Sequence, residues 1–249
     1  MRENYTLTRL YVSEALSEDA EMSLTEKQVH YLANVLRKKE GDNIRVFNGR
    51  DGEWLANVFS LTNKKYGDLR ILKQLHKSQR SPDITLCFAP IRKHRTQFII
   101  EKSTELGVRA LQPVITARTQ FPKLNIQKAR LQAIEAAEQT ERLDLPIIEP
   151  LLKLEVMLSN WDSKKPLIFA DEAGDALPAL SALEPLSEPS AILIGPEGGF
   201  THQEREMIRD HSFVTAVSLG PRILRADTAA LSLLTLWQAV QGDWSQNKD

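Results

Sequence analysis

Two glycine-rich segments near the end of the chain hold the residues best suited to chemistry. Residues 195–199 read Gly-Pro-Glu-Gly-Gly, and residues 219–229 read Leu-Gly-Pro-Arg-Ile-Leu-Arg-Ala-Asp-Thr-Ala. Each follows a short apolar run, at 191–194 and 214–219, and each leads into a helical pattern. Glycine permits tight bends and close approach of a ligand ring, and open α/β sheets bind ligands at the carboxyl ends of their strands. The pattern predicts one small-ligand crevice walled by both segments, against the alternative of two ordinary turns.

Polar residues accompany these glycines: Glu197, Arg222, Arg225, Asp227 and Thr228. Arg225 lies just before a predicted helix, where a guanidinium can meet a phosphate or a base edge. Its alternative role is an ion pair with Asp227 or Glu197. We expect Glu197 either to act in catalysis or to brace the glycine loop, and Asp227 or Thr228 to cap the final helix.

Several familiar active-site patterns are missing from the sequence. It has no GxxxxGK[ST] phosphate loop, no GxGxxG after the first strand of the α/β region, and no GxSxG nucleophile elbow. The histidines show no HExxH spacing, and a single cysteine excludes a Cys-based zinc site, so we expect no metal. That cysteine, Cys87, lies between Leu86 and Phe88 and is expected to be a buried strand thiol.

Residues 76–249 alternate strand and helix patterns, which predicts a mostly parallel α/β sheet. Strands are expected at 84–89, 111–115, 167–170, 191–194 and 214–219, and helices at 96–106 and 126–139. Thr201 and Glu204 form a capping box that predicts a helix directly after the first glycine segment.

Residues 1–75 predict a separate β-rich unit, joined to the rest by the polar stretch 76–82. Strands are expected at 44–47, 54–59 and 69–75, with a hairpin at Asn48-Gly49 and Asp51-Gly52. A capping box of Thr25 and Gln28 predicts a helix that ends near Gly41.

Charge is unevenly distributed along a chain whose formal net charge is −1. Residues 76–142 hold 12 Lys and Arg against 6 Asp and Glu, whereas residues 143–249 hold 8 against 16. The basic middle predicts a surface for a polyanion, or else a solvated basic helix. No stretch is apolar enough to span a membrane and the charged N-terminus lacks a signal-peptide core, so we expect a cytoplasmic protein without a membrane partner.

The two late motifs resemble those of the ribosomal RNA small subunit methyltransferase E family, the uridine-N3 enzymes of the SPOUT superfamily. The resemblance continues through residues 101–108 and 135–139, and through 35–37, Gly41 and 47–49, so it covers nearly the whole chain. The sequence departs from the family at Asp227, where glutamate is more usual. It also departs at 140–146, which are poorer in glycine and arginine than the family's segment, so a role in RNA contact near Arg142 is not carried over.

The resemblance implies a C-terminal SPOUT-type α/β trefoil-knot domain over residues 76–249 and an N-terminal β-rich PUA-like RNA-binding domain over residues 1–75. It implies a homodimer and the cofactor S-adenosyl-L-methionine. The implied reaction is methylation of N3 of a uridine in 16S rRNA, within the small ribosomal subunit.

The resemblance also implies roles for individual residues. Arg225 would stabilise negative charge on the base or anchor its phosphate, and Glu197 or Asp227 would accept the proton. Residues expected to hold the cofactor are Phe169, Ala170, Asp171, Ile194, Gly195, Pro196, Gly198, Gly199, Leu219, Gly220, Ile223, Leu224, Thr228 and Ala229. Residues expected to contact RNA are Arg9, Arg37, Lys38, Arg92, Lys93 and Arg95.

Other functions remain open from the sequence. One is a SPOUT enzyme that acts on transfer RNA or on another ribosomal nucleotide. Another is a non-catalytic RNA-binding assembly factor with the same fold. A nicotinamide oxidoreductase is disfavoured because the glycines lie late in the sheet.

Overall fold

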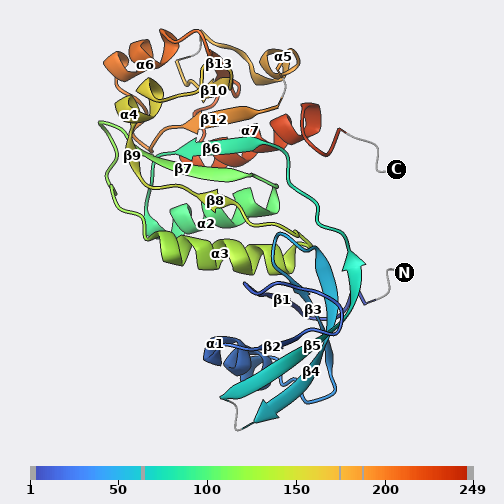
Figure 1. Cartoon of the computed structure of the whole chain (residues 1–249). Helices are drawn as coiled ribbons and strands as arrows, with labels where there is room; N and C mark the ends of the chain where they lie inside the picture. The colour runs from blue at the N-terminus through green and yellow to red at the C-terminus, as the bar shows by residue number, and fades with distance from the viewer. Residues whose placement is uncertain (1–3, 63–64, 174, 187, 246–249) are drawn as a thin grey trace. The chain divides into compact units, whose positions relative to one another are not determined.

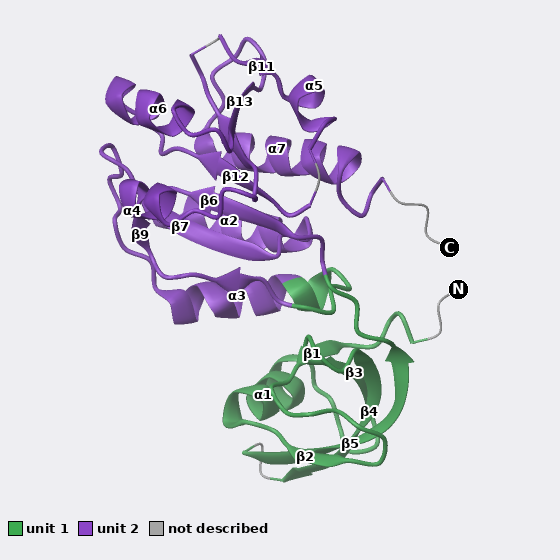
Figure 2. Ribbon diagram, turned by 45° about the horizontal axis from the view of Figure 1, so that its top comes forward, with its two compact units in different colours: residues 1–80, 137–144 green, residues 81–136, 145–249 purple. Residues whose placement is uncertain are grey.

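A computed structural model describes residues 4–62, 65–173, 175–186 and 188–245 (Figure 1). The chain forms two compact units (Figure 2). Unit 1 comprises Met1–Arg80 and Ala137–Asp144, and unit 2 comprises Ser81–Ala136 and Leu145–Asp249. Unit 1 is therefore built from two stretches that lie far apart in the sequence.

Unit 1 is a five-stranded sheet in the order β1-β3-β4-β5-β2. Its strands are β1 (Arg9–Tyr11), β2 (Glu21–Ser23), β3 (Asn43–Phe47), β4 (Glu53–Thr62) and β5 (Tyr66–His76). The predicted hairpin is confirmed between the antiparallel strands β3 and β4. In its turn the Asn48 side chain accepts hydrogen bonds from the backbone N–H groups of Arg50 and Asp51, at 3.0 and 2.8 Å.

One short helix packs on this sheet. Helix α1 (Glu26–His30) begins at the predicted capping box of Thr25 and Gln28, and it continues as the π-helical turn η1 (Tyr31–Val35). The expected extension to Gly41 is wrong, because Arg37 adopts the left-handed conformation at φ 55° and ends the helical path. The core joins residues of η1 and of the strands, including Leu32, Ile44 and Ile71.

Unit 2 is a parallel sheet in the order β11-β13-β10-β12-β6-β7-β8, with β9 paired to β7. Its strands are β6 (Ile84–Phe88), β7 (Ala110–Ile115), β8 (Ile147–Ile148), β9 (Leu152–Lys153), β10 (Leu167–Ala170), β11 (Leu177–Pro178), β12 (Ser190–Ile194) and β13 (Val214–Ser218). The predicted parallel sheet is confirmed, and its longer strands lie within one or two residues of the predicted spans.

Helices cover both faces of this sheet. They are α2 (Lys93–Glu105), α3 (Ile126–Gln139), α4 (Leu154–Ser159), α5 (Ala179–Leu183), α6 (His202–Arg209) and α7 (Ala226–Val240). On β12, Ile192 and Ile194 join the apolar cluster of α2, α5 and α7, whereas Ala191 and Leu193 join the cluster of α4 and α6. This alternation is the two-residue period of a strand buried on both faces. Among the described helices, none is long and apolar enough to cross a membrane.

Candidate active site

The order of the strands brings the two glycine segments together. Strand β10 pairs in parallel with β12 on one side and with β13 on the other. The loops that follow these three strands therefore meet at one edge of the sheet, and they enclose a cavity of about 280 Å³. This volume lies near the lower end of the range for small-ligand sites. The prediction of one crevice walled by both glycine segments is confirmed.

Most of the residues expected to hold the cofactor line this cavity: Ala170, Asp171, Ile194, Gly195, Pro196, Gly199, Leu219, Gly220, Ile223, Leu224 and Ala229. Three of the expected residues do not. Phe169 is buried below it and packs edge-on against Phe200, with ring centroids 5.2 Å apart. The Gly198 carbonyl accepts a hydrogen bond from Arg118 at 2.8 Å, and Thr228 is exposed on α7.

Glu172, Pro221 and Arg222, which belong to the loops expected to hold the cofactor, also line the cavity. Further lining residues were not expected from the sequence: Phe200, Val217, Ser218 and Ala226. Most of them lie within or next to the two glycine segments, so proximity along the chain was the available signal. Glu172 comes from the loop after β10, which the family resemblance already implied to help hold the cofactor, and the strand order places that loop beside the glycines.

The glycines keep this cavity open in two different ways. At Gly195 a Cβ would lie 2.6 Å from the Phe200 ring, and at Gly199 it would collide with the Glu172 carboxylate. Gly199 and Gly220 also have φ values of 64° and 98°, which disfavour any side chain. Glycine is therefore required by space at Gly195 and by conformation at Gly199 and Gly220, since the Glu172 carboxylate near Gly199 is the movable end of a side chain.

Buried acids fix the surrounding loops. Asp171 is 4% exposed and pairs with Arg205 at 2.9 Å and Arg209 at 2.7 Å, which ties the loop after β10 to α6. Glu204 completes the predicted capping box with Thr201 and also accepts a hydrogen bond from the Ala117 backbone N–H at 2.6 Å. These contacts preorganise the loops that form the cavity walls.

Arg225 and Glu197 lie on the lining of the cavity with exposed side chains. Neither forms an ion pair with any residue that the structure describes, so the proposed pairing of Arg225 with Asp227 or Glu197 is wrong. Asp227 instead pairs with Arg95, at 3.2 Å.

The start of α7 also differs from expectation. Arg225 occupies the N-cap position without a side-chain hydrogen bond, so neither Asp227 nor Thr228 caps the helix as expected. The helix simply begins earlier, and the Asp227 carboxylate accepts a hydrogen bond from the Thr228 N–H at 3.0 Å within the first turn.

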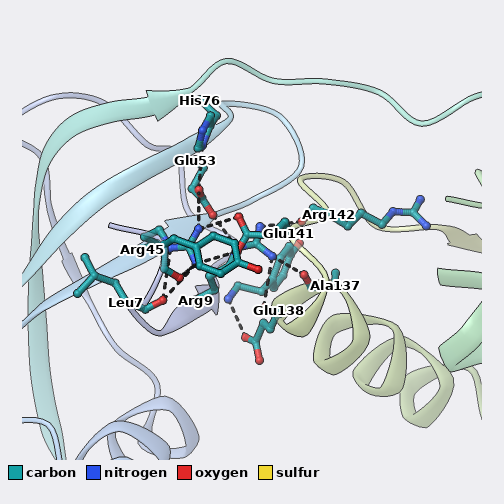
Figure 3. Close-up of polar contacts among 11 residues, drawn as sticks. Leu7, Arg9, Arg45, Glu53, His76, Ala137, Glu138, Glu141 and Arg142 are labelled. Carbon is teal, nitrogen blue, oxygen red and sulfur yellow. Dashed lines mark hydrogen bonds and ion pairs between the residues drawn. The ribbon is translucent and has the colours of Figure 1, made fainter. Parts of the chain in front are cut away.

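The residues expected to contact RNA differ in accessibility. Arg37, Arg92 and Lys93 are exposed, Lys38 is half-buried, and Arg95 is half-buried beside Asp227. Arg9 is only 4% exposed, contrary to expectation. Its guanidinium pairs with Glu53 at 2.6 Å and donates to the carbonyls of Ala137 and Arg142 (Figure 3). Arg9 is thus committed inside unit 1 and is not available to a phosphate.

A second arginine completes this buried cluster of unit 1. Arg45 donates two hydrogen bonds of 2.8 Å to the Glu141 carboxylate and pairs with Glu53 at 3.4 Å (Figure 3). The Arg45 hydrogen bond holds the pKa of Glu141 below its usual range. The sequence carried no signal for this cluster, because its members come from three separate segments.

Cys87 is fully buried on β6, and burial raises the pKa of its thiol to about 12. A thiol with this pKa is protonated at neutral pH and is not a nucleophile. The prediction of a buried structural cysteine is confirmed.

Comparison with known proteins identifies the family. Residues 78–238 match the RNA methyltransferase domain family, and residues 24–72 match the RNA methyltransferase PUA domain family. Ribosomal RNA small subunit methyltransferase E from Rickettsia conorii is 35% identical over 91% of this chain and 93% of its own. The protein of that name from Bacillus subtilis is 31% identical over 92% of each chain.

A solved structure agrees with these matches. The ribosomal RNA small subunit methyltransferase E from Neisseria gonorrhoeae, crystallised with S-adenosyl methionine, has 30% identity and a TM-score of 0.85. The similarity covers 96% of this chain and 99% of that one. Its extent includes both glycine segments and the loops around them, and this chain therefore belongs to the ribosomal RNA small subunit methyltransferase E family.

Proposed function

We propose that this protein transfers a methyl group from S-adenosyl-L-methionine to N3 of a uridine in the 16S rRNA of the small ribosomal subunit. The observation that carries the proposal is the glycine-walled cavity at the carboxyl ends of β10, β12 and β13, with Arg225 free on its lining. Family membership supports the same reaction, and the Neisseria relative was solved with S-adenosyl methionine.

The residues of the cavity fit this cofactor. Gly195 and Gly199 stand where a Cβ would meet the Phe200 ring or the Glu172 carboxylate, and open space faces Gly220. A flat purine can approach the Gly220 backbone closely, while Ile194 and Leu219 supply apolar contacts. When bound, the cofactor supplies an activated methyl group on its sulfonium.

The protein's part in the reaction is to position the base and manage its charge. A uridine N3–H is weakly acidic, so removal of its proton must be assisted. Arg225 stabilises the negative charge that develops on the uracil ring. Glu197 accepts the proton, in preference to Asp227, because the Asp227 carboxylate already pairs with Arg95.

The substrate and assembly follow from the same proposal. The RNA is held through its phosphates by Arg37, Lys38, Arg92, Lys93 and Arg95, and the protein acts as a cytoplasmic homodimer. The late strands form a trefoil knot. The strand order supports this threading, because the chain runs from β10 to β12 on one side and then to β13 on the other.

The test is a methylation assay on small ribosomal subunits that lack the modification. The protein is incubated with S-adenosylmethionine carrying a labelled methyl group, and the modified nucleotide is identified by mass spectrometry. We expect one labelled uridine, methylated at N3. Label on transfer RNA or on another atom would redirect the proposal to a different substrate, and absence of both label and cofactor binding by calorimetry would support an assembly factor.

A further inference from the structure

Unit 2 contains a second cavity, larger than the first at about 450 Å³. Its walls come from the connection between β6 and α2, from the first turns of α2, from residues 120–125 after β7, and from α3. It shares no lining residue with the cavity proposed to hold the methyl donor. Of its lining residues, the proposed reaction uses only Lys93, as a contact to the RNA backbone.

The lining of this second cavity suits an anion with a flat apolar body. Its floor is apolar and includes Ile91 and Ile100, and the Phe121 side chain on its wall is 40% exposed. Lys123 and Lys128 are exposed on the rim, and none of the lining residues is acidic. An aromatic ring with nearby cations is the usual arrangement for stacking a base and neutralising its phosphate.

The strand order places this cavity beside the first one. Strand β6 lies next to β12, and β7 follows β6, so their carboxyl ends continue the edge that holds the donor cavity. Arg95, next in sequence to the lining residue Thr96 of the second cavity, pairs at 3.2 Å with Asp227, which is next to the lining residue Ala226 of the first. A single RNA strand that follows this edge therefore meets both cavities.

The loop after β7 also connects the two cavities physically. Residues 120–125 wall the second cavity, and two residues earlier Arg118 donates a hydrogen bond of 2.8 Å to the Gly198 carbonyl in the glycine turn. Next to Arg118, the Ala117 N–H donates to Glu204 at the start of α6. The same loop thus contributes residues to the wall of the second cavity and contacts to the first.

We propose that the second cavity binds an unstacked nucleotide of the substrate RNA that neighbours the target uridine. Its base stacks on Phe121, and its phosphate lies against Lys123 and Lys128. Proteins commonly recognise RNA through splayed, unstacked bases that pack on aromatic side chains. The inference rests on the proposed RNA methylation, and it adds a site for a second nucleotide.

The experiment measures binding of unmodified small ribosomal subunits, without methyl donor, at several salt concentrations. We expect Phe121→Ala to weaken binding by about 5-fold to 100-fold, and Phe121→Trp to retain it. Lys128→Ala should make the negative slope of log affinity against log salt concentration shallower by about one unit. The matched control is Lys164→Ala, which removes an exposed lysine from the loop before β10, at the opposite edge of the sheet.

Kinetics and light scattering complete the test. In methyl transfer, Phe121→Ala should raise KM for the subunits while kcat and cofactor affinity stay unchanged. Wild-type subunit binding by both Phe121→Ala and Lys128→Ala would overturn the inference. If light scattering showed that these variants changed the oligomeric mass while RNA binding stayed intact, the inference would also be overturned, and the cavity would be a protein–protein interface. Because binding is measured without methyl donor, the site can be judged even if the proposed methylation fails.

Discussion

At the scale of single residues, Arg225 differs from Arg95 and Arg205 in having no carboxylate partner among the described residues, and it shares this property with Arg222 on the lining of the donor cavity. Arg95 pairs with Asp227, and Arg205 pairs with Asp171. The sequence pointed to Arg225 through its place before a helix, but several acids nearby were equally good partners. Only the contacts show which acids already have a cationic partner and which arginines lack a carboxylate partner.

Replacing Arg225 tests its role in the reaction. We expect Arg225→Ala to lower kcat by about 100-fold, the scale seen when one charge-stabilising donor is removed. Arg225→Lys, which keeps the charge without the planar fork, should retain part of the activity. Cofactor affinity by calorimetry and the Tm should stay close to wild type, because the side chain is exposed. Parallel losses of stability and activity would instead indicate a structural role.

Glu141 makes a residue-scale prediction about pH. Its pKa is lower in the folded protein than the ordinary value of 4.5, chiefly because Arg45 hydrogen-bonds its carboxylate. The ionised Glu141 carboxylate therefore stabilises the folded state fully at pH values above its unfolded pKa. This stabilisation is lost as the pH falls through its lower folded pKa. Glu141→Gln should make unit 1 less stable at pH 7, and the difference from wild type should shrink as the pH falls below 4.5.

The measurement is hydrogen exchange of the β1 and β3 amides, corrected for the intrinsic pH dependence. Glu18→Gln serves as a control at an exposed acid of unit 1 that does not contact the buried arginines. A difference between wild type and Glu141→Gln that stayed constant from pH 7 to pH 3 would contradict the linkage.

At the scale of elements, the strongest local signals in the sequence produced the predicted structure. Both capping boxes form, and helix α3 has the predicted bounds. These features depend on neighbours along the chain, so tertiary contacts could reinforce but not redirect them. The start of α7 was mispredicted because its cap position is held by Arg225 and stabilised by no side-chain hydrogen bond.

The cap of α6 yields a stability prediction. The Thr201 hydroxyl accepts a hydrogen bond from the Glu204 N–H at 3.1 Å at the start of this helix. Thr201→Ala should lower the free energy of unfolding of unit 2 by about 1 kcal/mol, and Thr201→Ser should lower it by less. Urea unfolding followed by circular dichroism provides the measurement. Equal effects of the two substitutions would mean that the hydroxyl does not stabilise the helix.

At the scale of the whole molecule, unit 1 depends on a segment from much later in the chain. Residues 137–144 supply acceptors to Arg9 and Arg45, both of which lie buried in the N-terminal strands. We therefore propose that the folding domain is larger than residues 1–75 and includes this segment. The sequence predicted a domain made of one continuous stretch, because local patterns carry no information about which distant segment packs against it.

Two ion pairs of unit 1 have the same length but differ in how deeply they are buried. Arg9 pairs with Glu53 and Arg70 pairs with Glu21, each at 2.6 Å, but the first pair is at most 2% exposed and the second about half exposed. Arg9→Ala should destabilise unit 1 by about 3 kcal/mol, since buried Glu53 would keep only its longer pair with Arg45 and the carbonyls of Ala137 and Arg142 would lose their donor. Arg70→Ala should cost less than about 1 kcal/mol. Hydrogen exchange in β3 and β4 tests both, and similar losses would contradict the role of burial.

The parallel α/β sheet, the β-rich unit, the two glycine turns and the family could be predicted from the sequence, because they depend on residue types at short spacings. The position of β10 between β12 and β13, which brings both turns and the loop after β10 to one cavity, is known only from the tertiary structure. The tertiary structure also decided that Arg9 is buried while Arg225 is free. Burial and pairing depend on which distant segments meet, and that information is not contained in any local pattern of the chain.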